Sequence, residues 1–562
     1  MKDDYKHSKE AFVSGMTGST VAHINMIALV ALASIALHSA IRSRLPPQKS
    51  FLFLSEWLLL VIPLLLSMTL FARRPGTLSV ILLLPTAFIC FLFPPYQSGT
   101  PLPSGGVVSP RASPVSRHAP GFHHDKPTWQ GAASGEEPET TRLSALSTYR
   151  AHMMLVTVLA ILAVDFPVFP RMLAKCETYG VSFMDMGVGS FVFSQGIVSA
   201  IPVIQLINHP PDLRPPIRLE ILSVLERSLP VLVLGLLRVV LVKGTQYPEH
   251  VTEYGVHWNF FLTLALIPVL RVLLHPLITN MPISLLGLIV ASAHQLSLSV
   301  GMTSYVLHAA RQNLISANKE GLVSLMGYFA IHLLGLSTGT FIIPHSPSYF
   351  RRQQAAVQGR RNSDAGVRAR SSTNTTQHRV SMPVHRENDK TATVLFSYAV
   401  IYWTLFGICR YLHIGGPDVS RRLVNLPYIA WVAAYNTSVL LCYLLLDLAF
   451  FATPLSKSTY SPVSGLKVVR RPSNSDDHDS DSDSTPLTMP GPSPMPAPPL
   501  LEAVNQNSLA VFLLANVATG VVNLSMRTMY ASNGRAMCVL GAYAFGMCAF
   551  AWAMRGRRVW KL

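Results

Sequence analysis

The sequence predicts an all-α protein that crosses a membrane many times, on the evidence of its composition and its apolar runs. Hydrophobic residues make up 50% of the 562 residues and charged residues only 13%, and the mean hydropathy is +0.36. A soluble globular domain carries about 25% charged residues. Several apolar runs match the roughly 20 residues that a helix needs to span a bilayer. The chain is therefore predicted to be a polytopic integral membrane protein rather than a soluble one.

We predict about thirteen transmembrane helices from the lengths of the apolar runs. The second and third are separated only by the turn RRPG, and the last two are rich in Gly, Ala and Asn. Small residues of this kind allow helices to pack closely inside a membrane. The predicted helices cover residues 22–42, 51–71, 77–95, 148–166, 184–207, 219–242, 257–275, 283–302, 322–344, 392–413, 426–451, 507–530 and 534–554.

Three connections between these helices are long and biased in composition. Residues 96–147 are rich in Pro, Gly, Ser and His, residues 345–391 in Arg, and residues 452–506 hold an acidic Ser/Asp run and a Pro-rich run. Such segments cannot bury enough apolar surface to offset the entropy of ordering, so we predict that they are disordered. The predicted parts are the N-terminal segment with helices 1–3 (1–95), a disordered loop (96–147), helices 4–9 with the candidate site (148–344), a disordered basic loop (345–391), helices 10–11 (392–451), a disordered acidic and Pro-rich loop (452–506), and helices 12–13 with a basic tail (507–562).

The net charge of +17 indicates orientation in a bilayer and not nucleic-acid binding, because the excess Lys and Arg lie in the connections and the tail. The connection 345–391 carries nine Lys or Arg, and the tail RGRRVWKL carries four. An odd number of spans puts both on one side of the membrane, and the positive-inside tendency makes that side cytoplasmic. We therefore expect the N-terminus and residues 165–180 on the lumenal side.

Asp165 and Lys175 are the main candidates for chemistry. They lie in the stretch DFPVFPRMLAKCETYG, directly after an apolar run. Two prolines end the helix and turn the chain back, so we expect the acid and the amine to meet. Such a pair could take a proton from a hydroxyl and stabilise an oxyanion, with a structural salt bridge as the main alternative. Asp185 is open to pairing with Arg171 or Lys175 as a structural ion pair.

Further polar residues collect at the same predicted side of the membrane. His250 and Glu253 have the i, i+3 spacing of half a metal motif, but no other ligands accompany them, so we predict no metal site. The six cysteines are spaced singly, which predicts no disulfide framework. Arg421 and Arg422 either extend to the lipid headgroups or bind anionic groups.

Five segments of the sequence resemble one known family. They are YKHSKEAFVSGMTGST, DFPVFPRMLAKCETYGVSFMDMGVGSFVFSQG, HVTEYGVHWNFFLTLAL, SRRLVNLPYIAWVAAYN and NSLAVFLLANVATGVVNLSMRTMY. In this order they are similar to the glycosylphosphatidylinositol (GPI) inositol acyltransferases, which are the PIG-W proteins of animals and the fungal GPI-anchored wall transfer proteins. The resemblance extends over the chain except for the three long connections. This chain departs from the family at Met172-Leu173, where Arg-Phe is usual, and at Cys176.

The resemblance implies an enzyme of the endoplasmic reticulum membrane, with a lumenal N-terminus and a cytoplasmic C-terminus. It implies transfer of a fatty acyl group, typically palmitoyl, from acyl-CoA to the inositol 2-hydroxyl of glucosaminyl-phosphatidylinositol. The family's acid and lysine correspond to Asp165 and Lys175, and His250 is our second candidate base. The candidate binding residues are Arg171, Glu177, Asp185, Glu253, His257, Asn259, Arg421, Arg422 and Asn523.

Two other functional classes stay open at this stage. A lipid or solute transporter would suit many spans with polar residues inside the membrane, although the sequence shows no internal repeat. A scaffold whose long connections bind partners is the other alternative. We expect no cofactor beyond the acyl-CoA co-substrate, and no obligate protein partner.

Overall fold

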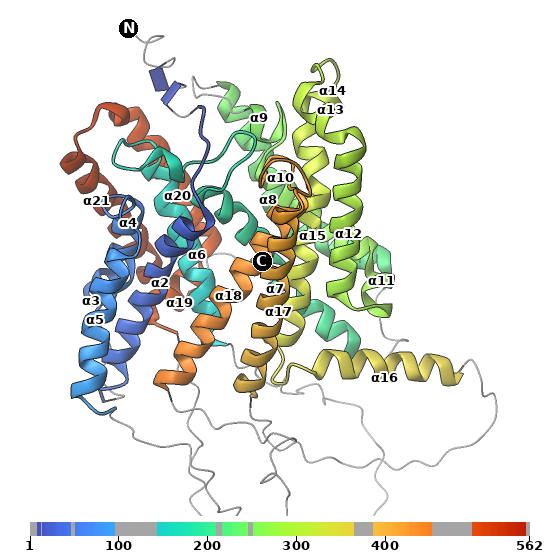
Figure 1. The fold of residues 1–562 in the computed structure, drawn as a ribbon, viewed down its shortest axis with the longest axis horizontal. Helices are drawn as coiled ribbons and strands as arrows, with labels where there is room; N and C mark the ends of the chain where they lie inside the picture. The colour runs from blue at the N-terminus through green and yellow to red at the C-terminus, as the bar shows by residue number, and fades with distance from the viewer. Residues whose placement is uncertain are drawn as a thin grey trace, which may run out of the picture.

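The computed structural model describes residues 8–9, 11–12, 14–46, 51–95, 143–208, 216–244, 251–364, 386–451 and 497–557. Their regular secondary structure is helical, and the one β contact among them is an isolated antiparallel bridge between Ser19 and Val181. The helices form a bundle of roughly parallel elements (Figure 1). The predicted all-α, multi-pass membrane fold is confirmed.

Nine helices of the described part are long and apolar enough to cross a membrane. They are α2 (Val21–Arg42), α6 (Ser144–Ala163), α7 (Phe183–Asn208), α12–η4–α13 (Ile283–His308), α15 (Lys319–Ile342), α17 (Asn388–Tyr411), α18 (Leu426–Phe450), α20 (Ser508–Ser525) and α21 (Asn533–Ala553). The shorter elements are α3 (Phe53–Glu56), η1 (Trp57–Val61), α4 (Ile62–Met68), α5 (Thr77–Leu92), η2 (Arg171–Leu173), α9 (Val251–Tyr254), α10 (Phe260–Leu273), α11 (His275–Asn280), α14 (Leu314–Ala317) and η5 (Thr528–Tyr530).

The thirteen predicted segments all contain helix, but the number of thirteen spans is not confirmed. The helices α5 and α10 have 16 and 14 residues, fewer than the roughly 20 that a helix needs to cross a bilayer without local thinning. The long helix α8 (Ile217–Gly244) carries Glu226 and Arg227 within its apolar sequence. Apolar run length alone therefore finds the helices without deciding which of them span.

The prediction of disorder is wrong at the margins of two connections. The helix α16 (Tyr349–Asp364) lies across the lower end of the bundle in Figure 1. The helix α19 (Pro499–Gln506) packs against α6 and α21 through Leu500, Leu501 and Val504, which are fully buried. These short apolar and basic stretches were hidden within connections whose average composition is polar. The centres of all three connections lie outside the described residues.

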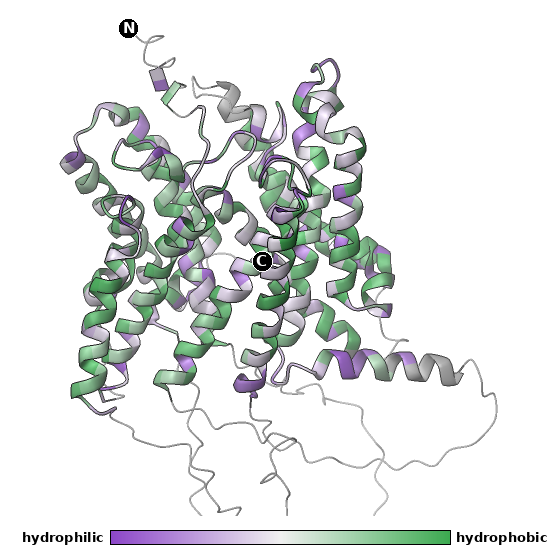
Figure 2. Ribbon diagram, in the orientation of Figure 1, coloured by the Kyte–Doolittle hydropathy of each residue, from purple (hydrophilic) through white to green (hydrophobic). Residues whose placement is uncertain are grey.

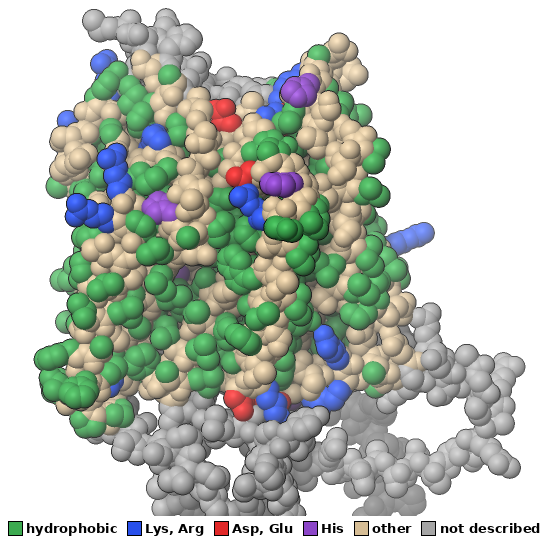
Figure 3. Space-filling model, viewed as in Figure 1, with side chains coloured by type: hydrophobic (Ala, Val, Ile, Leu, Met, Phe, Trp, Pro, Cys, Tyr) green, Lys and Arg blue, Asp and Glu red, His purple; other side chains and the backbone are tan. Residues whose placement is uncertain are grey.

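Hydropathy divides the bundle into three layers along its axis. Hydrophobic segments fill the middle, and hydrophilic ones gather towards the two ends (Figure 2). On the face that Figure 3 shows, most Lys, Arg, Asp and Glu side chains lie towards these ends. The described ends of the helices that flank the three long connections lie at one end of the bundle, the lower end in Figure 1. This arrangement agrees with the prediction that these connections share one side of the membrane.

The helices α7 and α15 cross at glycines in the centre of the bundle. A Cβ on Gly196 would lie 2.2 Å from the carbonyl oxygen of His332, and one on Gly335 would lie 2.2 Å from the carbonyl oxygen of Phe193. The two backbones are therefore in direct contact, which is the close packing that small residues permit in membrane proteins. This crossing fixes α7, whose first turn carries Asp185.

Four connections meet at the end of the bundle opposite the long ones. They are the N-terminal segment (residues 8–9, 11–12 and 14–20), the 164–182 loop between α6 and α7, the helix α9, and the 412–425 loop between α17 and α18. The backbone N–H of Ser19 donates to the Val181 carbonyl at 2.7 Å, and that of Gly180 donates to the Val419 carbonyl at 2.8 Å. The 164–182 loop is thus held between the other connections.

Candidate active site

The 164–182 loop turns sharply because α6 ends at Ala163 and hydrogen bonds from Arg171 then hold the turn. After α6 ends at Ala163, the rings of Phe166 and Phe169 are fully buried below the turn. The Arg171 side chain donates to the carbonyls of Val164, Phe166 and Phe169 at 2.7, 3.2 and 2.9 Å. These carbonyls lie beyond the end of α6 and have no helical N–H as a partner, so the guanidinium supplies hydrogen bonds that the helix does not.

The main role of Arg171 is therefore to hold the turn through these hydrogen bonds. Its guanidinium carbon lies 4.1 Å from the centre of the Phe12 ring, which belongs to the N-terminal segment. Burial lowers the pKa of Arg171 to about 10, while the nearby Asp165 carboxylate opposes this shift. The guanidinium stays charged at neutral pH, and Nη1 is its one nitrogen with no hydrogen bond among the described residues.

Asp165 lies at the centre of a buried polar cluster, called here the Asp165 cluster (Lys9, Asp165, Asn523 and Thr528). Asn523 Nδ2 donates to Asp165 Oδ2 at 2.8 Å, and Lys9 Nζ lies 3.4 Å from Asp165 Oδ1. Lys9 Nζ and Thr528 Oγ1 both donate to Asn523 Oδ1, at 2.9 and 3.2 Å. The predicted site residues Asp165 and Asn523 are thus in direct contact.

The expected ion pair between Asp165 and Lys175 is wrong. The acid pairs with Lys9 from the N-terminal segment, and Lys175 Nζ bonds to Glu253 Oε2 at 3.0 Å. The bend after α6 does turn the chain back, but the loop continues past Asp165 and brings Lys175 to α9. Both side chains remain in one loop at the same end of the bundle.

Lys175 begins a second cluster of alternating charges, called here the Asp185 network (Lys175, Glu253, Arg421 and Asp185). Arg421 Nη2 lies 3.8 Å from Glu253 Oε1, and Arg421 Nε donates to Asp185 Oδ1 at 2.6 Å. Lys175 is the most exposed member, with 34% of its side chain accessible, against 18%, 2% and 1% for the others. The network thus leads from solvent to the interior and places four predicted site residues together.

Asp185 pairs with Arg421, so the predicted pairing with Arg171 or Lys175 is wrong. The second carboxylate oxygen of Asp185 accepts from the backbone N–H of Cys176 at 3.0 Å and from Ser182 Oγ at 2.8 Å. Burial lowers the pKa of Arg421, but the Glu253 and Asp185 carboxylates together raise it well above its usual value. The guanidinium is therefore permanently charged and fixed in orientation.

Arg422 belongs to a neighbouring cluster on α15. Its Nη2 donates to Glu320 Oε1 at 2.9 Å, and Arg311 donates to both oxygens of the same carboxylate at 2.6 and 3.0 Å. Two guanidinium groups against one buried carboxylate leave a net positive charge. Among the described residues, Arg421 Nη1 and Arg422 Nε have no hydrogen-bond partner although both atoms are buried. Consecutive arginines thus present unused donors beside the Asp185 network.

The other predicted residues have local structural roles or lie outside the description. Glu177 Oε1 accepts from the backbone N–H of Gly15 at 2.7 Å, which ties the N-terminal segment to the 164–182 loop. Asn259 is the N-cap of α10 and accepts from the Leu262 N–H. The backbone of His257 is held by Asn318. His250 lies outside the described residues.

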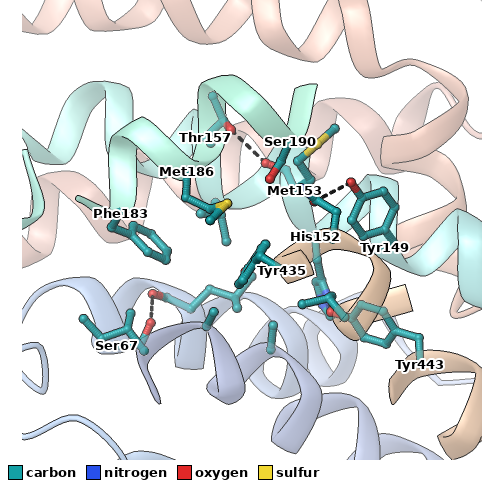
Figure 4. A pocket seen from close by; sticks show the side chains of 18 residues that line it. Ser67, Tyr149, His152, Met153, Thr157, Phe183, Met186, Ser190, Tyr435 and Tyr443 are labelled. Carbon is teal, nitrogen blue, oxygen red and sulfur yellow. Dashed lines mark hydrogen bonds between the residues drawn. The ribbon is translucent and has the colours of Figure 1, made fainter. Parts of the chain in front are cut away.

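An apolar pocket, called here the central pocket, lies between α2, α4, α6, α7 and α18 and has a cavity volume of about 60 Å³ (Figure 4). Its upper wall includes Met186 and Gly187, the two residues that follow Asp185. Tyr149 OH on its wall donates to Asn436 Oδ1 at 2.7 Å, and His152 Nδ1 bonds with Tyr443 OH at 2.6 Å, whereas Ser190 Oγ and His152 Nε2 have no hydrogen-bond partner among the described residues. The lining residues are Ile27, Ala28, Ala31, Leu64, Ser67, Tyr149, His152, Met153, Val156, Thr157, Phe183, Met186, Gly187, Ser190, Tyr435, Asn436, Val439 and Tyr443.

Sequence reasoning missed Lys9, Ser182 and Tyr428 as members of this site. Tyr428 OH donates to the backbone carbonyl of Asp185 at 2.8 Å and holds the first turn of α7. Lys9 was visible only as one of several charges near the N-terminus, with no signal for its partner 156 positions later. Within the described part of the chain, no three His, Cys, Asp or Glu side chains gather as metal ligands would.

Comparison with known proteins identifies relatives over nearly the whole length. The GWT1 family model matches residues 5–554. The chain is 36% identical to GPI-anchored wall transfer protein 1 of Cryptococcus neoformans var. grubii, over 99% of both chains. It is 34% identical to the protein of that name from Aspergillus oryzae, over 97% of this chain and 96% of the relative. The protein of that name from Yarrowia lipolytica is 33% identical, over 95% and 94%.

Proposed function

Because the chain belongs to the GWT1 family, we propose that it is a membrane O-acyltransferase acting on an inositol lipid in GPI-anchor biosynthesis. A role in GPI-anchor biosynthesis and a multi-pass membrane location follow from the family and from the apolar helices. The proposed reaction transfers a fatty acyl group, which we expect to be palmitoyl, from acyl-CoA to the inositol 2-hydroxyl of glucosaminyl-phosphatidylinositol. The proposed location is the endoplasmic reticulum membrane, with the N-terminus and the site lumenal and the C-terminus cytoplasmic.

One observation carries this proposal: a buried carboxylate, a partly exposed amine and unused guanidinium donors lie at one end of the bundle, above an apolar pocket. Acyl transfer to a lipid hydroxyl needs all four features. They are a base for the hydroxyl, a cation for the oxyanion, donors for a phosphate, and space for an alkyl chain.

In the proposed mechanism, Asp165 takes the proton from the inositol hydroxyl while the oxygen bonds to the thioester carbonyl carbon. The negative charge that develops on the carbonyl oxygen is stabilised by the Lys175 ammonium. The carbon–sulfur bond then breaks, and the CoA thiolate leaves and takes up the proton. Glu253 keeps Lys175 in place through the 3.0 Å contact. His250 remains the second candidate base.

Binding is assigned to the remaining groups around the two clusters. Arg421 and Arg422 offer Nη1 and Nε to a phosphate, either that of the inositol lipid or one of CoA. The acyl chain lies in the central pocket, whose upper wall adjoins Asp185. Glu253 and His257 contact the sugar hydroxyls. No cofactor other than the acyl-CoA co-substrate takes part in this scheme, and it requires no protein partner.

The proposal is tested with purified protein, acyl-CoA and glucosaminyl-phosphatidylinositol, by measuring CoA release and the acylated lipid. Asp165→Asn should lower kcat by roughly 10²–10⁴, the share that a general base supplies. Asp389→Asn is the matched control, because Asp389 lies in the first turn of α17 at the opposite end of the bundle. Near-normal turnover by Asp165→Asn would remove the base from the mechanism. A protein that moves lipid without releasing CoA would be a transporter.

A further inference from the structure

The N-terminal segment brings a second charged group to the proposed base. From Phe12 to Ser19 it runs along the 164–182 loop, through the Phe12 ring against Arg171 and the Gly15 N–H bond to Glu177. It then joins the loop in the bridge between Ser19 and Val181. The glycines at this contact leave no space for a side chain, since a Cβ on Gly18 would lie 2.4 Å from the Val181 carbonyl oxygen. Lys9 precedes this docked stretch, so docking delivers its ammonium to Asp165.

Lys9 is placed differently from an ordinary surface lysine. Only 8% of the residue is exposed, and its ammonium lies between Asp165 Oδ1 and Asn523 Oδ1 at 3.4 and 2.9 Å. A lysine is rarely buried to this extent unless it is paired. The contact to the amide is the shorter of the two, so Asn523 fixes the ammonium while its own Nδ2 fixes Asp165. The three side chains come from the N-terminal segment, the 164–182 loop and α20, and they form a closed ring of contacts.

Lys9 is the cation in ion-pair contact with Asp165 within the described residues. Arg171 is the other nearby cation and its charge also acts on Asp165, but its Nε and Nη2 donate to backbone carbonyls and not to the carboxylate. Asn523 and Thr528 are neutral. The 3.4 Å contact with Lys9 is the one ion pair of Asp165 in the described chain. A buried carboxylate with no compensating charge is strongly disfavoured in its ionised form.

We propose that Lys9 is a positioning residue for the acyl transfer, which compensates and orients Asp165 through the Lys9–Asn523–Asp165 ring. This inference rests on the proposed function, because it takes Asp165 to be the base. Lys9 does not contact the reacting atoms in this scheme. It acts on the chemical step and not on substrate binding, so its loss should lower kcat and leave the KM values for acyl-CoA and for the acceptor unchanged.

The test is a set of Lys9 variants of the full-length protein in detergent, assayed for CoA release. Lys9→Met keeps the length of the side chain without its charge and should lower kcat by about tenfold or more, a part of the effect of the base itself. Lys9→Arg should retain most of the activity. In Lys9→Cys, aminoethylation with 2-bromoethylamine adds an ammonium and should restore turnover, whereas carbamidomethylation adds a neutral group and should not. The native protein, treated with both reagents, shows their effect on its six cysteines.

Lys390→Met is the matched control, because Lys390 pairs with Glu387 at 2.6 Å at the opposite end of the bundle. Full activity of Lys9→Met would overturn the inference. A loss accompanied by a lower thermal midpoint, and not restored by aminoethylation, would also overturn it, since Lys9 would then only hold the fold. If Asp165→Asn is inactive while Lys9→Met is fully active, the proposed function stands without this inference. If Asp165→Asn is active, the proposed base fails first.

Discussion

The buried ion pair between Asp185 and Arg421 gives the sharpest prediction for stability. The two side chains are 1% and 2% exposed and meet at 2.6 Å. Removing one partner of a buried pair costs about 3–5 kcal/mol, because the other charge is left without compensation. The destabilisation by Arg421→Met should lie at the lower end of this range, since Asp185 keeps its hydrogen bonds from Cys176 and Ser182. Asp185→Leu should fall at the upper end, since Arg421 keeps only Glu253 at 3.8 Å among its ion pairs.

The double variant Asp185→Leu/Arg421→Met should be more stable than the sum of the single effects allows. It removes both charges, and Glu253 still has Lys175 at 3.0 Å. The remaining loss is the acceptor for two donors, which costs about 1–3 kcal/mol per unsatisfied group. Two such groups cost about 2–6 kcal/mol together, which is below the roughly 8 kcal/mol that additive single effects would give.

The assay is the temperature at which half of the detergent-solubilised protein is lost from its size-exclusion peak after heating. We expect the double variant to have a higher midpoint than Asp185→Leu. The exposed pair between Arg410, in the last turn of α17, and Asp418, in the 412–425 loop, is the matched control, with 43% and 36% of the side chains accessible. A double-mutant cycle on this control pair should give a coupling free energy below about 1 kcal/mol. A double variant that melts at or below the less stable single variant would refute the reasoning.

Three further predictions concern packing, reactivity and the pocket. Gly335→Ala should destabilise the protein by at least about 1–3 kcal/mol, because its Cβ meets the Phe193 carbonyl and neither backbone can yield; a lower midpoint checks this. Burial and the neighbouring Asp185 carboxylate raise the pKa of Cys176, so its thiol should stay largely unmodified by iodoacetamide at pH 8, as mass spectrometry of the peptide would show. Ala31→Phe should lower the preference for palmitoyl-CoA over lauroyl-CoA by on the order of tenfold, at about 0.8 kcal/mol per methylene displaced from the central pocket, whereas Leu29→Phe on the exposed face of α2 should not.

The helices could be predicted from the sequence because a membrane requires long apolar runs. Each predicted segment contains a helix, including α15 and α18, whose residues are apolar on nearly all sides. The predictions failed where a short segment differs from the average composition of its surroundings. The residues 499–506 form α19 inside a connection that is polar overall, and charges within α8 make its spanning role undecidable from run length.

The partners of the charged residues could not be predicted, although the residues themselves could. Asp165 and Lys175 were singled out by two prolines and by charge at a membrane boundary, which are local signals. Their actual partners, Lys9 and Glu253, lie 156 and 78 positions away in sequence. An ion pair between distant connections depends on how helices pack, and periodicity carries no information about it. Asn259, which was predicted only as a binding residue, caps α10, and its position directly before an apolar run is a local signal for that role.

The ion pairs at this end of the bundle have a common pattern that explains why they are retained. Each buried carboxylate is paired with a cation from another connection: Asp165 with Lys9, and Asp185 with Arg421. Such pairs add little net stability compared with apolar packing, because desolvation offsets their attraction. They do fix the relative positions of the segments that carry them. A reaction that needs a base and an oxyanion donor from one loop and a phosphate ligand from another requires such fixed positions. Apolar replacement of a pair should therefore leave the fold largely intact and lower the rate, so stability and activity at this site are expected to separate.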